Sequence, residues 1–123
     1  MKPKTKLEIL QETADFYAAD PKGRRGYSEE EGLCLYQTEE GRQCAVGRCM
    51  TTPDIYAQFC GTVSELKTGA GGLDKLLKPE YQGHPLVFWT HLQQFHDRQE
   101  NWTDTELTNL GGAYLEQLKK QYA

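Results

Sequence analysis

Long hydrophobic runs are missing from this chain: none approaches the roughly 20 apolar residues that a membrane-spanning helix needs. The first residues, Met-Lys-Pro-Lys-Thr-Lys, lead into an amphipathic pattern and lack the apolar core and cleavage site of a signal peptide. Positive charge is not in excess either, since 14 lysines and arginines stand against 18 acidic residues, for a net charge of −4. The missing apolar run and signal sequence predict a cytoplasmic protein with no membrane contact. Because broad nucleic-acid binding needs a basic face, the net negative charge predicts no broad nucleic-acid binding.

Phosphate-binding motifs are absent as well. The sequence contains neither a Gly-x4-Gly-Lys-Ser/Thr loop nor a dinucleotide fingerprint, and the glycine-rich stretch Gly69–Gly72 matches neither pattern. Internal repeats and low-complexity tracts are also missing. A chain of 123 residues without these features is expected to form one domain with one modest core.

Cysteine is scarce, with four in the chain, and cytosolic thiols are kept reduced. A structural zinc site normally presents two pairs of ligands, each pair two to four residues apart. Cys44 and Cys49 come near that spacing, whereas Cys34 and Cys60 each stand alone. We expect packed thiols and no cofactor, and we keep zinc binding by these four cysteines as the weaker alternative.

A small zinc- or thiol-dependent enzyme is the third function class that the sequence allows. Cys49 follows Arg48 and precedes an expected helix start at Pro53, an environment that can lower the pKa of a thiol. No sequence around any cysteine matches a protease or transferase signature. The prediction is therefore a protein without catalytic residues.

Three stretches have the periodicity of amphipathic helices. The first is predicted over residues 6 to 19, opened by the capping box Thr5–Glu8. The second opens at Pro85, and the third is predicted to start at another capping box, Thr103–Glu106. The pair Gly111-Gly112 inside the third helix predicts the close approach of another backbone, because glycine is unfavourable in a helix without such a reason.

Residues 33–37 and 43–48 are predicted to form a β-hairpin. Between them, Gly41 suits the left-handed position of a three-residue turn. The basic stretch before the hairpin, residues 22–26, is predicted to be a flexible connector. Together with the three helices, the hairpin predicts an α+β fold: a small antiparallel sheet packed against about three α-helices in a single domain.

Arginines and aromatic residues are the most informative candidates for a binding site. Guanidinium groups grip phosphate or carboxylate through paired hydrogen bonds, and aromatic rings stack on planar bases. We predict a site for a small anionic or nucleotide-like ligand in which arginines hold the anion, rings stack and a histidine adds a polar contact: Arg24, Arg25, Arg48, Tyr36, Trp102 and His96. The alternative for each residue is a structural role in the core or in a surface ion pair.

The order of these features resembles that of a group of short phage-encoded proteins of unassigned function. The shared elements are an Arg24-Arg25 connector after a Leu/Ile-rich helix, a Gly-x-Cys-x-Tyr motif at 32–36 and a Cys-Ala-Val-Gly motif at 44–47. A later His96-Asp97 helix followed by a tryptophan also looks shared, and residues 62–83 depart from the pattern as an insertion-like stretch. The resemblance implies a viral accessory protein in the cytoplasm of an infected bacterium.

The sequence and the resemblance together predict a non-enzymatic, anti-defence-type protein that sequesters a small phosphorylated or nucleotide-like ligand. The second hypothesis is a protein that binds and inhibits a host protein, with no small ligand. Homo-oligomerisation is plausible for either, because a chain this short can complete a pocket with a second copy.

Overall fold

The computed structural model describes residues 3–28, 33–34, 41–51 and 75–123. Five α-helices lie in this part of the chain, with two 3-10 turns and one pair of very short strands. In chain order the elements are α1 (Lys6–Ala19), α2 (Pro21–Arg24), β1 (Tyr27–Ser28), β2 (Leu33–Cys34), α3 (Ala45–Cys49), η4 (Pro79–Tyr81), α4 (Leu86–Asp97), η5 (Gln99–Asn101) and α5 (Asn109–Gln121).

The first helix confirms the sequence prediction at both ends. The Thr5 hydroxyl accepts a hydrogen bond from the Glu8 amide at 3.1 Å, and the Glu8 carboxylate accepts one from the Thr5 amide at 2.9 Å. This capping box satisfies amides that the first turn would otherwise leave unpaired. At the other end Asp20 accepts from the Gly23 amide and so caps the next helix, α2. The predicted flexible connector over residues 22–26 is therefore wrong in its first half, which is helical.

The predicted hairpin is also wrong, and the fold is mainly helical rather than α+β. The stretch expected to form the second strand contains helix α3, which begins at Ala45. Cys44 caps this helix, because its sulfur accepts from the Gly47 amide at 3.3 Å. Strand β2 pairs instead with β1, over two residues on each side. This short ladder replaces the expected sheet. Of the expected turn, residues 38–40 lie outside the described residues, whereas Gly41 has the positive φ, 85°, that was expected of it.

The later helices agree with the prediction in part. Helix α4 follows Pro85 as expected. The Thr103 hydroxyl accepts from the Glu106 amide at 3.0 Å, as in a capping box, but no helix follows. Instead Thr103 and Glu106 pair through the backbone at 2.8 Å and close a turn. Helix α5 starts six residues after Thr103, at Asn109, with Thr108 as its cap.

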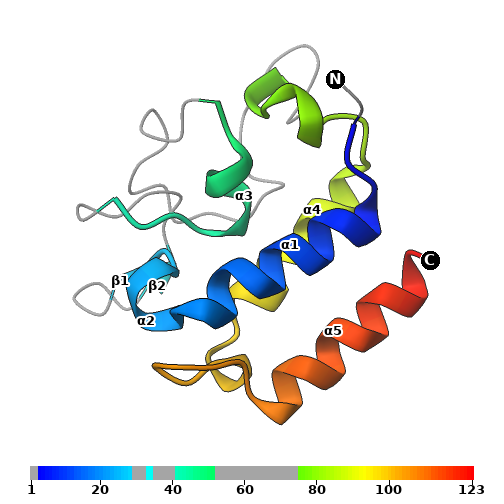
Figure 1. The fold of residues 1–123 in the computed structure, drawn as a ribbon. Coiled ribbons are helices and arrows are strands. Elements are labelled where there is room, and N and C mark those ends of the chain that lie inside the picture. Colours follow the sequence, from blue (N-terminus) through cyan, green and yellow to red (C-terminus); the bar gives the residue numbers. More distant parts are fainter. Residues whose placement is uncertain (1–2, 29–32, 35–40, 52–74) are drawn as a thin grey trace.

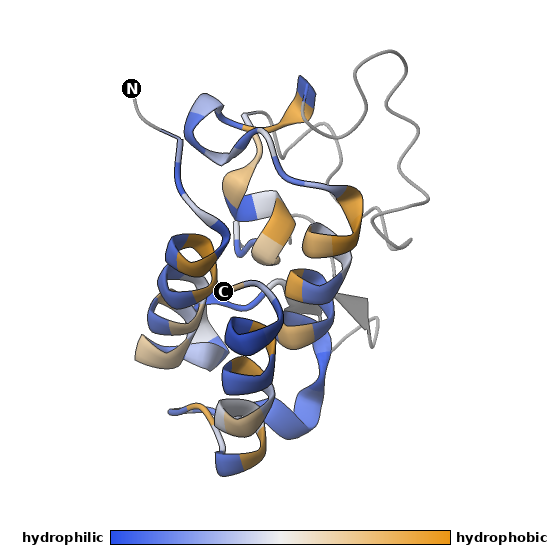
Figure 2. Cartoon of the chain, turned by 90° about the vertical axis from the view of Figure 1, so that its right-hand side faces the viewer, coloured by the Kyte–Doolittle hydropathy of each residue, from blue (hydrophilic) through white to orange (hydrophobic). Residues whose placement is uncertain are grey.

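Three long helices form the body of the described structure (Figure 1). Helix α1 packs on α5, and α5 in turn contacts α4, while the short helix α3 lies against α4. Each long helix carries both hydrophilic and hydrophobic residues, as Figure 2 shows. The core that they enclose is rich in aromatic side chains, and its largest fully buried members are Trp89, Tyr17, Phe88, Phe95, Ile9 and Leu10.

Close packing of α5 explains one of its two glycines. A Cβ atom at Gly111 would lie 2.5 Å from the backbone oxygen of Asn101, far inside contact distance. The prediction of a close backbone approach is confirmed at Gly111. At Gly112 a Cβ atom would meet nothing within 4 Å, so that prediction is wrong for the second glycine.

None of the helices in the described part of the chain is long and apolar enough to cross a membrane.

Candidate functional site

The ring of Tyr17, near the C-terminal end of α1, lies among three of the predicted binding residues. The buried ring of Tyr17 packs edge-on against His96, with 4.8 Å between ring centroids, and lies 6.2 Å from the ring of Trp102. The guanidinium of Arg25 lies 5.7 Å from the centre of the Trp102 ring. Three of the six predicted residues therefore form one cluster, which we call the Tyr17 cluster: Tyr17, Arg25, His96 and Trp102.

Arg25 is buried, with 7% of its surface exposed. Its Nε and Nη2 atoms donate to the carbonyl of His96 at 3.1 and 2.8 Å, and Nη1 donates to the side chain of Gln99 at 3.1 Å. A cation is favourable here, because the carbonyls at the end of α4 carry partial negative charge. Arg25 therefore stabilises the end of α4, and its fork is directed at the protein rather than at solvent.

His96 has no exposed surface. Its Nε2 atom accepts a hydrogen bond from the Gly26 amide at 3.2 Å, so the ring proton lies on Nδ1, which donates to Asp97 at 2.7 Å. Burial lowers the pKa of His96, and its hydrogen bond to Asp97 acts in the opposite direction. The ring is thus a neutral structural connector between the chain at Gly26 and α4.

Trp102 completes the same cluster. Its indole nitrogen donates to the carbonyls of His96 and Phe95 at 3.0 and 3.3 Å. The ring is only 7% exposed and lies 5.3 Å from the ring of Phe95. Since both its polar atom and its faces are engaged, Trp102 packs in the core and leaves no free face for a base.

The fourth predicted residue, Arg48, belongs to a second group that connects α3, α1 and η4. Its Nη1 atom pairs with the Glu12 carboxylate at 2.8 Å and lies 3.4 Å from the Tyr81 hydroxyl. Lys4 and the Tyr81 hydroxyl bind the same carboxylate. We call Lys4, Glu12, Arg48 and Tyr81 the Glu12 network.

The electrostatics of the Glu12 network favour an ionised Glu12 carboxylate that pairs with Arg48. Partial burial opposes ionisation of Glu12, but hydrogen bonds from Lys4, Tyr81 and Arg48 outweigh it and lower the pKa of Glu12 to about 2. The Arg48 side chain is only 13% exposed, against 27% for Glu12. Arg48 is thus neutralised by an internal carboxylate that occupies the place where an anionic ligand would bind.

Among the described residues, Arg24 makes fewer polar contacts than the other two arginines of the predicted site. Its guanidinium stacks on the ring of Phe16 at 4.5 Å, and Nη1 donates to the Phe16 carbonyl at 2.9 Å. Within the described ranges no carboxylate pairs with it. Arg48 lies 5.3 Å from the centre of the same ring, so two guanidinium groups adjoin Phe16.

The sixth predicted residue, Tyr36, lies outside the described residues, as does Cys60, and the side chain of Cys34 is not described. Cys44 and Cys49 are buried free thiols, and burial raises the pKa of each to about 12. Such thiols are protonated at neutral pH and are shielded from substrates. Among the described residues no three histidine, cysteine or acidic side chains are grouped as a metal site requires.

Sequence reasoning missed Glu12, Phe16 and Tyr81. A signal for the first two exists, because Glu12 follows Ile9 by three residues and precedes Phe16 by four, which places all three along one side of α1. An acidic residue on that inner side predicts an internal cation partner. Nothing in the local sequence points to Tyr81.

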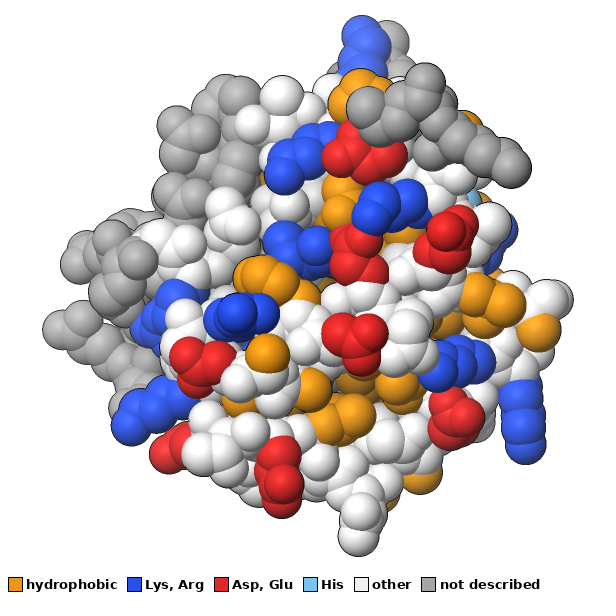
Figure 3. All heavy atoms as spheres, viewed as in Figure 1, with side chains coloured by type: hydrophobic (Ala, Val, Ile, Leu, Met, Phe, Trp, Pro, Cys, Tyr) orange, Lys and Arg blue, Asp and Glu red, His pale blue; other side chains and the backbone are white. Residues whose placement is uncertain are grey.

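Charges on the visible face of the molecule are interspersed rather than separated (Figure 3). Basic and acidic side chains alternate across the described part of this face, with apolar side chains between them.

Comparisons with protein-family models, with curated proteins and with solved structures find no match to this chain.

Proposed function

We propose that the protein is a non-catalytic binding protein that captures a small anionic, phosphate-bearing ligand at the surface around Arg24. The observation that carries this proposal is the state of the three arginines. Arg25 and Arg48 are held by several internal acceptors. Arg24 is half-buried, and among the described residues its guanidinium donates a single hydrogen bond, to the Phe16 carbonyl. The remaining donors of its fork suit an oxyanion.

Two neighbouring cations extend this surface along α2. The Lys22 side chain is 68% exposed, and its nearest described acid, Asp104, is 4.0 Å away, so the pair holds it weakly. Arg42 donates to the carbonyls of Lys22 and Arg25 at 3.4 Å each, which places its side chain beside α2. An anion bound to Arg24 would therefore lie in a locally positive field.

The stacked arrangement of Arg24 also suits the proposal. A guanidinium fixed on an aromatic ring loses little conformational freedom when it binds an anion, because its plane is already set. The Arg24 guanidinium lies over the Phe16 ring, 4.5 Å from its centroid. The absence of a catalytic role is supported by the burial of His96, Cys44 and Cys49.

Titration calorimetry with inorganic phosphate and a panel of nucleoside mono- and diphosphates tests this function. We expect Arg24→Ala to weaken binding of the best anion at least tenfold without changing the melting temperature. Arg98→Ala is the control, because the exposed Arg98 also stacks on an aromatic ring, that of Tyr114, at 4.9 Å. Equal binding by wild type and Arg24→Ala, or no binding of any of these anions at millimolar concentration, would overturn the proposal.

A host protein as the partner is the second candidate function, and one observation favours it. Leu86 and Val87, adjacent at the start of α4, are 46% and 52% exposed. Apolar side chains of this size are common contact points between proteins. A pull-down from bacterial lysate that recovers one stoichiometric partner with wild type, and loses it in a Leu86→Asp, Val87→Asp variant, would favour this function over ligand capture.

A further inference from the structure

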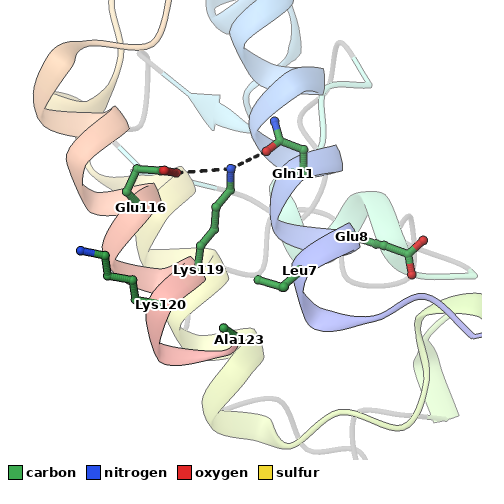
Figure 4. A pocket seen from close by; sticks show the side chains of 7 residues that line it. All are labelled: Leu7, Glu8, Gln11, Glu116, Lys119, Lys120 and Ala123. Atoms are coloured by element: carbon green, nitrogen blue, oxygen red, sulfur yellow. Dashed lines mark hydrogen bonds and ion pairs between the residues drawn. The ribbon is translucent and has the colours of Figure 1, made fainter.

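An open trench runs between the N-terminal half of α1 and the C-terminal half of α5 (Figure 4). Its volume is about 540 Å³. The helices are antiparallel here, because Lys119 near the end of α5 bonds to Gln11 near the start of α1. The trench is lined by Leu7, Glu8, Gln11, Glu116, Lys119, Lys120 and Ala123.

The shape of the trench suits a protein surface better than a small molecule. Lys119 is the only lining residue that is partly buried, and the other lining residues are exposed. Small-molecule sites enclose most of their ligand, which a trench with exposed walls cannot do. Leu7, 39% exposed, projects into it as the largest apolar side chain of the lining.

The charges on the α5 wall are self-complementary. Glu116 and Lys120 lie four residues apart, on one side of the helix. Lys120 is exposed and has no hydrogen bond or ion pair within the described part of the chain. Glu116, with a side chain 66% exposed, has one ion pair among the described residues, with the partly buried Lys119 at 3.3 Å. Under a two-fold axis between the two positions, Glu116 of one copy faces Lys120 of the other, and the reverse.

We propose that the occupant of this trench is a second copy of the chain, which forms a two-fold symmetric dimer with the α5 helices antiparallel. Such an interface uses the same patch twice and therefore must be complementary to itself. Leu7 of each copy enters the trench of the other, and the two Glu116–Lys120 pairs fix the register. The proposal is independent of the ligand site, because Arg24 lies beyond the opposite end of α1.

Size-exclusion chromatography with light scattering, over a dilution series of the full chain, tests the assembly. Wild type is expected to have the mass of a dimer at high concentration and to dissociate on dilution. Leu7→Asp should raise the dissociation constant at least tenfold. Leu110→Asp is the matched control: Leu110 is 59% exposed on the same helix but does not line the trench, so that variant should dimerise like wild type.

A charge-reversal pair tests the register. Lys120→Glu and Glu116→Lys should each be monomeric alone, because each places like charges opposite one another in the dimer. An equimolar mixture of the two should form a heterodimer, since every facing pair is then of opposite charge. Circular dichroism of each variant confirms that the fold is intact.

Two results would overturn the proposal. One is a wild-type chain that stays monomeric at the highest concentration, which would leave the trench to a different partner. The other is a dimer that Leu7→Asp and Leu110→Asp weaken equally, or that the mixed charge variants fail to restore, which would place the interface on another surface.

Discussion

The two ends of α1 are covered in opposite ways. At the C-terminal end Tyr17 is enclosed by Arg25, His96 and Trp102, whose polar atoms all find partners inside the protein. At the N-terminal end Leu7 lines an open trench. One helix thus has a closed end, whose buried polar groups stabilise the fold, and an open end, where the exposed side chain of Leu7 lines a trench.

This difference shows that residue type alone does not identify a binding residue. Arginine, histidine and tryptophan are typical of ligand sites, but at the closed end they replace backbone hydrogen bonds that the irregular chain cannot make for itself. Exposure of unpaired donors separates the two cases. The predictions below test the comparison, starting with the variant expected to damage the fold most.

Arg25→Ala should be the most destabilising change. It removes three side-chain hydrogen bonds, two to the His96 carbonyl and one to Gln99, although Trp102 still donates to that carbonyl. A hydrogen bond from a charged group contributes about 1.5–3 kcal/mol, so we expect a loss of at least about 3 kcal/mol in the free energy of unfolding, measured by urea unfolding. Arg24→Ala, at the adjacent position, should cost less than about 1 kcal/mol. A similar cost for both variants would contradict the division between closed and exposed arginines.

Arg48→Ala should lower the free energy of unfolding by about 2–3 kcal/mol, less than a fully buried pair because Glu12 keeps some solvent contact. The double variant with Glu12→Gln should be less destabilised than the sum of the two single variants, since the two groups interact directly. Additive effects in this double-mutant cycle would show that Arg48 acts through its packing on Phe16 instead.

The two glycines of α5 should respond with opposite signs. Gly111→Ala forces a methyl group against the Asn101 carbonyl and should cost about 1–3 kcal/mol. Gly112→Ala meets open space and should stabilise the helix by up to about 1 kcal/mol. The melting temperatures of the two variants test this prediction. A rise for both variants would contradict the close contact between Gly111 and the Asn101 backbone.

Stability should fall as the pH drops below about 6.5. His96 is neutral when buried, so its folded pKa is lower than its unfolded pKa and the unfolded chain binds the extra proton first. Asp97, which favours the protonated ring, opposes this effect, and nearby Arg25 reinforces it. Unfolding free energies between pH 7 and 5 should show this slope in wild type and a smaller one in His96→Gln. An unchanged slope in the variant would assign the effect to other groups.

The smallest effect on the fold is expected at the open end. Leu7→Asp should change the free energy of unfolding of the monomer by less than about 0.5 kcal/mol, because the side chain is already partly in water. Chemical unfolding at concentrations where the wild type is monomeric measures it. A loss of several kcal/mol would show that Leu7 packs into the core and that this end is not open.

The sequence predicted what depends on local signals. The bounds of α1 follow from a capping box and a proline, both of which act within a few residues. The stretch after Cys44 could not be assigned in the same way, because its residues are buried through packing against α4 rather than through strand alternation. At Thr103 the local signal was genuine, since its hydroxyl accepts the expected amide, but the chain closes a turn there instead of continuing as a helix.

The sequence predicted three residues that lie close together in the candidate site, but it did not predict what their side chains contact. Sequence reasoning selected Arg25, His96 and Trp102, and the structure does bring these three together. What they contact depends on the path of the chain from α1 through α2 to Gly26, which no local pattern encodes. The internal partner of Arg48 likewise comes from another helix, so its neutralisation by Glu12 became visible only in three dimensions.

The double hydrogen bond of His96 has a consequence for how related sequences can vary. Position 96 requires a side chain that accepts from the Gly26 amide and donates to Asp97 at the same time. Glutamine can meet both demands, whereas leucine or lysine meets at most one. Positions 96 and 97 should therefore change together or not at all when relatives of this chain are aligned.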